Sequence, residues 1–128
     1  MKGKTAVRTD GAPAPGGVYS QAVRAGEFLY TAGVGPLDPA SREVVGKSIE
    51  DQTRQTLSNL MAILTAAGAT EAQVVKTTVH LQNLARDFAG MNDVYREFFK
   101  EPYPVRTTVG STLHGFLVEI DLVAFLGG

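Results

Sequence analysis

The chain of 128 residues contains no cysteine and only two histidines. Without cysteine the protein has no disulfide bond, no thiolate nucleophile and no thiolate metal ligand. His80 and His114 have no neighbours at the spacing of metal ligands, and two scattered histidines do not predict a Ser-His-Asp triad. The glycines also lack the spacings of a phosphate-binding or dinucleotide-binding loop. The sequence therefore predicts a protein without a metal or an organic cofactor.

The sequence also lacks an excess of charge and a long apolar run. Its formal net charge is −1, and no basic stripe is present, so we expect neither nucleic acid nor an anionic membrane as a partner. The sequence has no run of about 18 apolar residues, so we predict no transmembrane helix. Residues 1–17 have no apolar core of a secretory signal. We expect a cytoplasmic protein.

Length and composition are those of one globular domain, which we predict to span residues 1–128. Residues 1–17 are rich in Gly, Pro and Ala, and they suit a short strand near residues 5–9 followed by an irregular segment, or a partly flexible tail. Pro13 and Pro15 lack the backbone donor that a central strand needs.

Two amphipathic helices are predicted. The first spans Ser48–Ala67, with Ser48 and Asp51 at capping-box spacing and Gly68 as the C-terminal cap. The second spans Asp87–Lys100, with Asp87 as its cap and Gly90 at a point of close packing. The predicted buried stripes are Ile49, Thr53, Leu57, Leu60, Leu64 and Ala67 in the first helix, and Phe88, Met91, Tyr95, Phe98 and Phe99 in the second.

Alternating apolar residues predict strands on both sides of these helices. Residues 19–24 and 28–32 indicate a hairpin around Ala25-Gly26, and Val44-Val45 could add a short strand. Val74–Leu81 alternates as well, with Val75, Thr77, Val79 and Leu81 on the covered side and His80 on the polar side. Two helices with one apolar stripe each suit one face of a mixed sheet, so the fold class is α+β. The other face, with Phe28, Tyr30, Leu117, Val123 and Phe125, predicts an oligomer.

Residues Tyr103–Asp121 combine two strand patterns with the residues best suited to chemistry. If Gly110 pairs with Gly115 around a loop of residues 111–114, the register places Arg106 opposite Glu119. A guanidinium binds carboxylates in a bidentate manner, and a glutamate can orient water or transfer a proton. Spacing alone supports two interpretations of this pair equally. The two residues could form a site for a small carboxylic acid, or an ordinary ion pair on a solvated sheet face.

Several segments together resemble the reactive intermediate deaminase family, also called YjgF-like, whose best-known members are imine/enamine deaminases. The matching segments are YSQAV (19–23), TAG (31–33), LDP (37–39), residues 51–69, residues 74–99, PVRTTV (104–109) and VEIDLVA (118–124). The resemblance covers nearly the whole chain from about Gly16 onward.

The resemblance implies a chorismate-mutase-like α+β fold with two helices on one face of a mixed sheet. It implies a homotrimer whose sheets form a barrel-like core, with ligand clefts between subunits. It also implies that Arg106 binds the substrate carboxylate and that Glu119 holds a water beside the imine carbon or the departing nitrogen. Tyr19 would close the cleft, Gly33 and Thr108 would offer backbone contacts, and Asn92 would lie near the site or serve the structure.

The activity implied is hydrolysis of 2-imino acids, such as 2-iminopropanoate and 2-iminobutanoate, or of their enamine tautomers, to 2-oxo acids and ammonia. Departures from the family pattern affect the substrate more than the reaction. Ala32 stands where a hydroxyl residue is frequent, Val34 where glutamine is common, and Val18 where proline is frequent. Residues 113–115 replace a Leu-Pro turn, and Thr108 occupies the place of a cysteine found in some members.

Other functions fit the same residues. Arg106 would equally serve a non-catalytic trimer that binds small carboxylates as a sensor. Ala32 and Val34 would suit a pathway-specific deaminase of a larger amino or imino acid. Ribonuclease activity, attributed to relatives, is the least favoured because the chain has no basic stripe.

Overall fold

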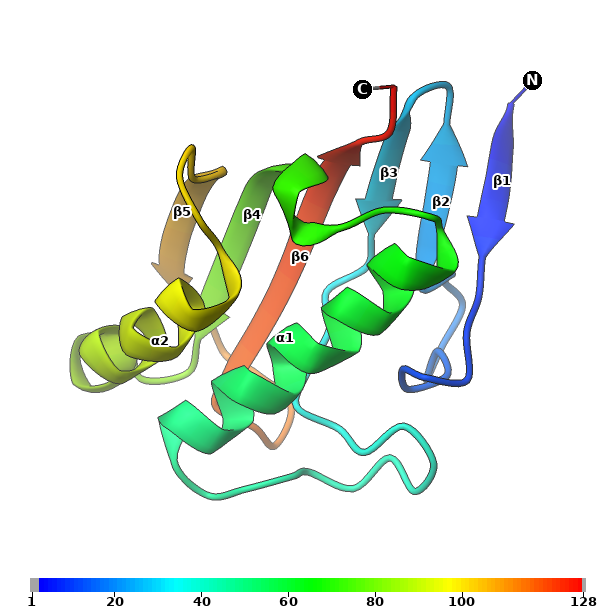
Figure 1. The fold of residues 1–128 in the computed structure, drawn as a ribbon. Helices are drawn as coiled ribbons and strands as arrows, with labels where there is room; N and C mark the ends of the chain where they lie inside the picture. Colours follow the sequence, from blue (N-terminus) through cyan, green and yellow to red (C-terminus); the bar gives the residue numbers. More distant parts are fainter. Residues whose placement is uncertain (1–2, 128) are drawn as a thin grey trace.

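The computed structural model describes residues 3–127, which form one mixed sheet with two α-helices packed on it (Figure 1). The elements in chain order are β1 (Lys4–Val7), β2 (Ala22–Ala25), β3 (Phe28–Thr31), α1 (Ile49–Ala66), a 3-10 turn (Glu71–Gln73), β4 (Val74–Leu81), α2 (Leu84–Phe98), β5 (Val105–Gly110) and β6 (Val118–Phe125). The six strands lie in the order β1-β2-β3-β6-β4-β5. Only the β4–β5 pair is parallel among these neighbours, so the predicted α+β class with a mixed sheet is confirmed.

Helix α1 forms as its end signals predict. The Ser48 hydroxyl accepts a hydrogen bond from the Asp51 backbone N–H at 3.0 Å, which satisfies one of the free donors of the first turn. Gly68 follows the last turn with a φ of 78°, the left-handed conformation that favours glycine. Its apolar stripe packs into the core, where Leu57, Leu60 and Leu64 are almost fully buried.

Helix α2 begins at Leu84, three residues before the predicted start, and Asn83 precedes it. Asp87 is therefore not a cap: it lies buried in the first turn, and the exposed Arg86 donates two hydrogen bonds to its carboxylate. Phe88 is also partly exposed rather than buried, whereas Met91 and Tyr95 face the core. Gly90 lies against α1, because a Cβ there would meet the Ile49 side chain at 2.7 Å.

The predicted N-terminal hairpin is confirmed. Strands β2 and β3 pair around Gly26, whose φ of 60° suits a tight turn. Strand β1 adds to the free edge of β2, in place of a flexible tail. Near residue 44 the structure has only an isolated bridge to Leu37, rather than a further strand.

The predicted hairpin between residues 103 and 121 is wrong. Strand β4 lies between β5 and β6, so these two strands are not neighbours. β4 and β5 are parallel and are joined through α2, as parallel strands require a crossover. The loop of residues 111–117 then passes the end of β4, where Ser111 N–H donates to the Leu81 carbonyl and Gln82 N–H to the Leu117 carbonyl.

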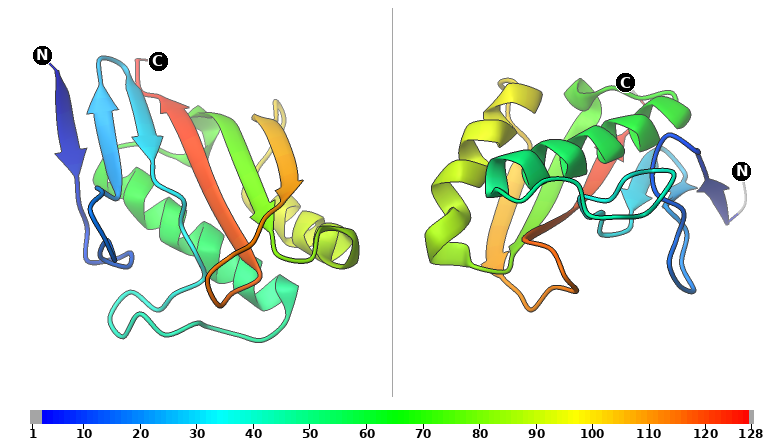
Figure 2. Two further views of the ribbon diagram at one scale, coloured as in Figure 1. Left: turned by 180° about the vertical axis from the view of Figure 1, so that it is seen from behind. Right: turned by 90° about the horizontal axis from the view of Figure 1, so that it is seen from below.

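Both helices cover the same face of the sheet, and the view from behind shows the other face with no helix upon it (Figure 2). Residues 118, 120, 122 and 124 of β6 point into the core and are almost fully buried. Residues of the opposite face include the half-exposed Phe28 and Tyr30, and the Phe28 ring lies 5.2 Å from that of Phe125. Leu117, predicted for this face, packs against the core instead.

Strand β4 departs from regular alternation at its start. A register shift between Val74 and Lys76 buries Val74 and leaves Val75 exposed, contrary to the prediction for Val75. Thr77, Val79 and Leu81 then face the helices as predicted.

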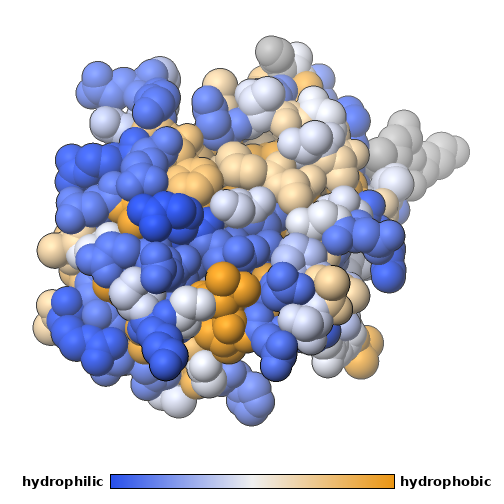
Figure 3. Space-filling model, turned by 60° about the horizontal axis from the view of Figure 1, so that its bottom comes forward, coloured by the Kyte–Doolittle hydropathy of each residue, from blue (hydrophilic) through white to orange (hydrophobic). Residues whose placement is uncertain are grey.

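Figure 3 shows the surface of the molecule with the bottom of the Figure 1 view turned forward. Hydrophilic residues cover most of this surface, and apolar residues form small groups on it.

Candidate functional site

Arg106 lies on the edge strand β5 and points toward α2. Its parallel partner in β4 is Thr77, which is fully buried on the helix-covered face. The guanidinium lies 4.7 Å from the centre of the Tyr95 ring, and Nη1 donates a hydrogen bond to Asn92 Oδ1 at 2.8 Å. Stacking on a ring and one amide contact fix the guanidinium plane while further N–H donors stay available for a ligand. Asn92, which the family resemblance placed near the site, is thus in contact with Arg106.

Tyr95 is a site residue that sequence reasoning assigned only to the core. Its hydroxyl shares a hydrogen bond of 2.8 Å with Thr77 Oγ1, and its ring supports the guanidinium of Arg106. Burial raises the pKa of the Tyr95 hydroxyl, against the opposing effects of the Thr77 hydrogen bond and of the Arg106 charge. The hydroxyl therefore stays neutral, and it adds no negative charge that would compete with a ligand carboxylate for the guanidinium of Arg106.

A pocket opens beside this arginine. It has a volume of about 420 Å³ and is lined by Asn92, Tyr95, Arg96, Tyr103, Pro104 and Arg106. Thr108 lies on the same face of β5 as Arg106, because its partner in β4 is the buried Val79. A cationic group at an aromatic-lined pocket suits a small ligand that carries a carboxylate.

Glu119 belongs to the other face of the sheet. Its neighbours along β6, Val118 and Ile120, are fully buried under the helices, so alternation directs Glu119 to the uncovered face. The carboxylate lies over the Gly33 backbone, where an added Cβ would approach Oε2 to 2.6 Å. Glycine at position 33 thus provides the space that the Glu119 side chain occupies.

Arg106 and Glu119 do not oppose each other, contrary to the predicted register. In the sheet Arg106 pairs with Thr77, while Glu119 pairs with His80, and the two side chains point to opposite faces. The alternative of an ordinary cross-strand ion pair within one chain is excluded by this arrangement. The structure brings together Arg106, Asn92 and Thr108 on one face, and Glu119 with Gly33 on the other.

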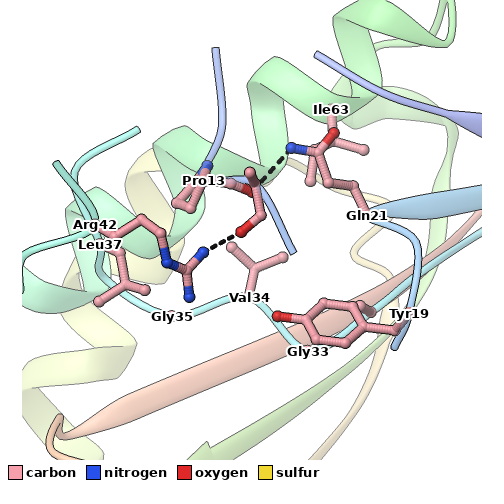
Figure 4. Close-up of a pocket in the computed structure, with 11 residues that line it drawn as sticks. Pro13, Tyr19, Gln21, Gly33, Val34, Gly35, Leu37, Arg42 and Ile63 are labelled. Atoms are coloured by element: carbon pink, nitrogen blue, oxygen red, sulfur yellow. Dashed lines mark hydrogen bonds between the residues drawn. The ribbon is translucent and has the colours of Figure 1, made fainter. Parts of the chain in front are cut away.

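Tyr19 borders a second, smaller pocket of about 40 Å³ next to Gly33 (Figure 4). Its hydroxyl accepts a hydrogen bond from the Gly16 backbone N–H at 2.9 Å, and the residue is exposed. Arg42 and Tyr19 approach this pocket from different sides, with Val34 between them in the view.

Two residues without a local sequence signal hold the loop before Tyr19. The buried Gln21 accepts from Thr9 N–H and donates to the carbonyls of Thr9 and Pro13. Arg42 donates to the Ala14 carbonyl and has a φ of 63°, which is uncommon for a residue other than glycine. Their partners are distant in the sequence, so only the fold reveals these contacts.

Among residues 3–127, no group of three or more His, Asp or Glu side chains is placed to hold a metal ion. No helix in this range is long and apolar enough to span a lipid bilayer.

The chain is similar to known proteins over almost its whole length. The model of the family described as endoribonuclease L-PSP matches residues 9–126. A RutC family protein of Pyrococcus horikoshii is 46% identical over 124 residues, which are 95% of this chain and 98% of that protein. The 2-iminobutanoate/2-iminopropanoate deaminase of Dermatophagoides farinae is 39% identical over 110 residues, which are 86% of this chain and 85% of that protein.

The fold also matches that of a solved protein structure. The crystal structure of E. coli TdcF with bound serine superposes with a TM-score of 0.87 at 35% sequence identity. The match covers 94% of this chain and 98% of that one.

Proposed function

Because this chain belongs to the endoribonuclease L-PSP family, which includes the reactive intermediate deaminases, we propose that it hydrolyses small 2-imino acids or their enamine tautomers. The products are a 2-oxo acid and ammonia. The observation that carries the proposal is Arg106, which is held by Asn92 and Tyr95 at the mouth of a 420 Å³ pocket. A relative named for 2-iminobutanoate and 2-iminopropanoate supports the same substrate class.

The proposed site lies between two copies of the chain. Arg106 and Glu119 point to opposite faces of one sheet, so one copy cannot direct both at the same small molecule. The uncovered face carries Phe28 and Tyr30 half-exposed, which suits burial against another copy. We propose a homotrimer in which Arg106 of one copy and Glu119 of the next flank each cleft.

In this proposal Arg106 binds the substrate carboxylate and so orients the imine carbon. The imine reacts in its protonated form, C=NH2+. Glu119 accepts a proton from a water as the water oxygen bonds to the imine carbon, and the C=N electron pair moves to nitrogen, which leaves a neutral amino group. Glu119 then returns the proton to nitrogen, the C–N bond breaks, and ammonia leaves with the bonding pair. The remaining hydroxyl loses its proton to Glu119 as the carbonyl forms. Ammonia finally takes that proton, which restores the carboxylate.

The remaining predicted residues have supporting roles. Tyr19 closes the cleft beside Gly33, and the backbone of Gly33 and Thr108 contacts the ligand. Asn92 keeps the guanidinium in place through the hydrogen bond of 2.8 Å. The reaction as proposed uses no metal and no organic cofactor, and we expect it to take place in the cytoplasm.

A coupled assay tests this function. A pyridoxal-phosphate dehydratase acting on serine or threonine generates the imine, and the release of 2-oxo acid is followed with and without the protein. We expect faster release with the protein, and a much weaker acceleration with an Arg106→Ala variant. An unimpaired Arg106→Ala variant, or no acceleration by the wild-type protein, would contradict the proposal.

Two alternatives remain as outcomes of the same experiments. A non-catalytic sensor of small carboxylates would bind a 2-oxo acid without turnover, and Glu119→Gln would have no kinetic effect. A deaminase of a larger imino acid would prefer longer substrates in a substrate profile, in keeping with Ala32 and Val34. The formal charge of −1 gives no support to RNA as a substrate.

A further inference from the structure

Arg42 ends a tight turn on the surface and has a backbone conformation that residues with a Cβ rarely adopt. Its φ is 63°, and glycine suits this left-handed region better because a Cβ crowds the backbone there. The turn is set by Asp38. Its carboxylate accepts hydrogen bonds of 2.9 Å from the backbone N–H groups of Ala40 and Ser41, and its carbonyl accepts one of 2.9 Å from that of Arg42. An arginine at a position that suits glycine indicates that its side chain contributes elsewhere.

The guanidinium of Arg42 lies against the segment of residues 13–17, which leads into Tyr19 (Figure 4). It donates a hydrogen bond to the Ala14 carbonyl, which is 28 residues away in the sequence. A Cβ added to Gly16 would meet Arg42 Nη2 at 2.5 Å, so glycine at position 16 lets the guanidinium approach the backbone closely. Arg42 therefore fixes this segment by one hydrogen bond and by close packing.

The same segment fixes the hydroxyl of Tyr19. The Gly16 backbone N–H donates to the Tyr19 oxygen at 2.9 Å, so the hydroxyl is an acceptor toward its own loop. A tyrosine hydroxyl also has one proton to donate, and the Gly16 N–H leaves that proton free because it is itself a donor. Tyr19 borders the pocket beside Gly33, and Gly33 lies against the Glu119 carboxylate. The proton of the Tyr19 hydroxyl is thus available to a ligand in this pocket.

We propose that Arg42 is a positioning residue for Tyr19 and that it acts through the backbone of residues 14–16. Its guanidinium holds the Gly16 N–H in place, this N–H orients the Tyr19 hydroxyl, and the hydroxyl donates its proton to an oxygen of the bound 2-imino acid or 2-oxo acid. The inference rests on the proposed function for the presence of this ligand beside Tyr19. The tether from Arg42 to Gly16 is a property of the folded chain alone.

The variant Arg42→Gly separates this role from a contribution to stability. Glycine adopts a φ of 63° without strain, so the thermal melt should stay close to that of the wild type. The dissociation constant of 2-oxobutanoate, measured by titration calorimetry, should rise about fivefold, which corresponds to the loss of one hydrogen bond. Ala40→Gly adds the same chain freedom to the same turn and keeps the guanidinium, so it should match the wild type. Arg42→Lys keeps a cationic donor and should recover part of the affinity.

A double variant tests whether the effect passes through Tyr19. Tyr19→Phe removes the hydroxyl, so adding Arg42→Gly to it should weaken the binding of 2-oxobutanoate no further. Additive effects of the two substitutions would overturn the inference. Gly16→Ala displaces the guanidinium without changing Arg42, and it should raise the same dissociation constant, which keeps the test valid if Arg42→Gly folds poorly.

Amide exchange measured by nuclear magnetic resonance reports on the tether in the absence of any ligand. The Gly16 N–H should exchange with water about fivefold faster in Arg42→Gly than in the wild type, because its acceptor is no longer held in place. Tyr19→Phe, which removes the acceptor itself, should have a similar effect, and Ala40→Gly should exchange at the wild-type rate. An unchanged Gly16 rate in Arg42→Gly would overturn the inference.

These measurements separate two kinds of failure. If the Gly16 amide exchanges faster in Arg42→Gly but the protein never accelerates imine hydrolysis, the role of Arg42 toward Tyr19 stands and the proposed function fails. If the protein is active and Arg42→Gly binds 2-oxobutanoate as tightly as the wild type, the inference about Arg42 fails while the proposed function stands.

Discussion

Arg106 and Glu119 point to opposite faces of the same sheet. Arg106 stacks on Tyr95 beneath α2, whereas Glu119 lies over Gly33 on the face that no helix covers within residues 3–127. One strand, β4, lies between the strands that carry them, β5 and β6. A reaction that needs both residues consequently needs two copies of the chain.

Replacing the guanidinium of Arg106 should lower kcat/KM strongly and thermal stability only slightly. For Arg106→Ala we expect kcat/KM to fall about 10- to 100-fold, the loss typical of a hydrogen-bonded charge pair. Arg106→Lys should recover only part, because an ammonium cannot form the bidentate contact. The coupled assay and a thermal melt measure both effects. Arg8→Ala, an exposed arginine outside both pockets, is the matched control, and an equal loss there would contradict the assignment.

Gly33→Ala should displace the carboxylate of Glu119. An added Cβ would lie 2.6 Å from Oε2, so the side chain must move, and it can do so because it is the end of a flexible chain. We expect a large fall in kcat with a free energy of unfolding close to that of the wild type. In Gly110→Ala the Cβ makes an ordinary contact of 3.5 Å with Leu84, and activity should be retained. Full activity in Gly33→Ala would place the functional carboxylate elsewhere.

The face assignments show how much of this site could be predicted from the sequence. The capping signals of Ser48 and Gly68 define α1 correctly, and the alternation along β6 assigns Glu119 to the face opposite the core. Alternation does not say which strands are neighbours. The insertion of β4 between β5 and β6 depends on the crossover through α2, a tertiary feature without a local signal.

Contacts between distant residues explain what else the sequence did not predict. His80 and Ser111 are 31 residues apart, and Arg42 reaches the Ala14 carbonyl over 28 residues. Neither pair has a characteristic spacing, so each residue alone indicates only a solvated polar side chain. Asn92 could be placed near Arg106 only through the family resemblance.

Alkaline pH should destabilise the protein through Tyr95. The pKa of its hydroxyl is raised by burial, so the unfolded chain loses this proton at a lower pH than the folded protein does. The free energy of unfolding is therefore unaffected by Tyr95 below about pH 10 and decreases above it. Tyr95→Phe should cost about 1 kcal/mol at neutral pH, through the lost Thr77 hydrogen bond, and should flatten the alkaline decrease.

Denaturant unfolding at several pH values measures this effect, with Tyr103→Phe as the control. Tyr103 is 57% exposed, so its replacement should leave the alkaline decrease unchanged. An equally steep decrease in Tyr95→Phe would assign the effect to other groups.

Mixing two variants of low activity tests the central claim most directly. Arg106→Ala and Glu119→Gln are each purified, then unfolded and refolded together in equal amounts so that copies assort at random. If each site takes Arg106 from one copy and Glu119 from another, about a quarter of the sites contain both residues, and activity returns to about a quarter of the wild-type level. If both residues act within one copy, every site lacks one of them. The activity of the mixture would then stay at the low level of its components, which would contradict a site shared between copies.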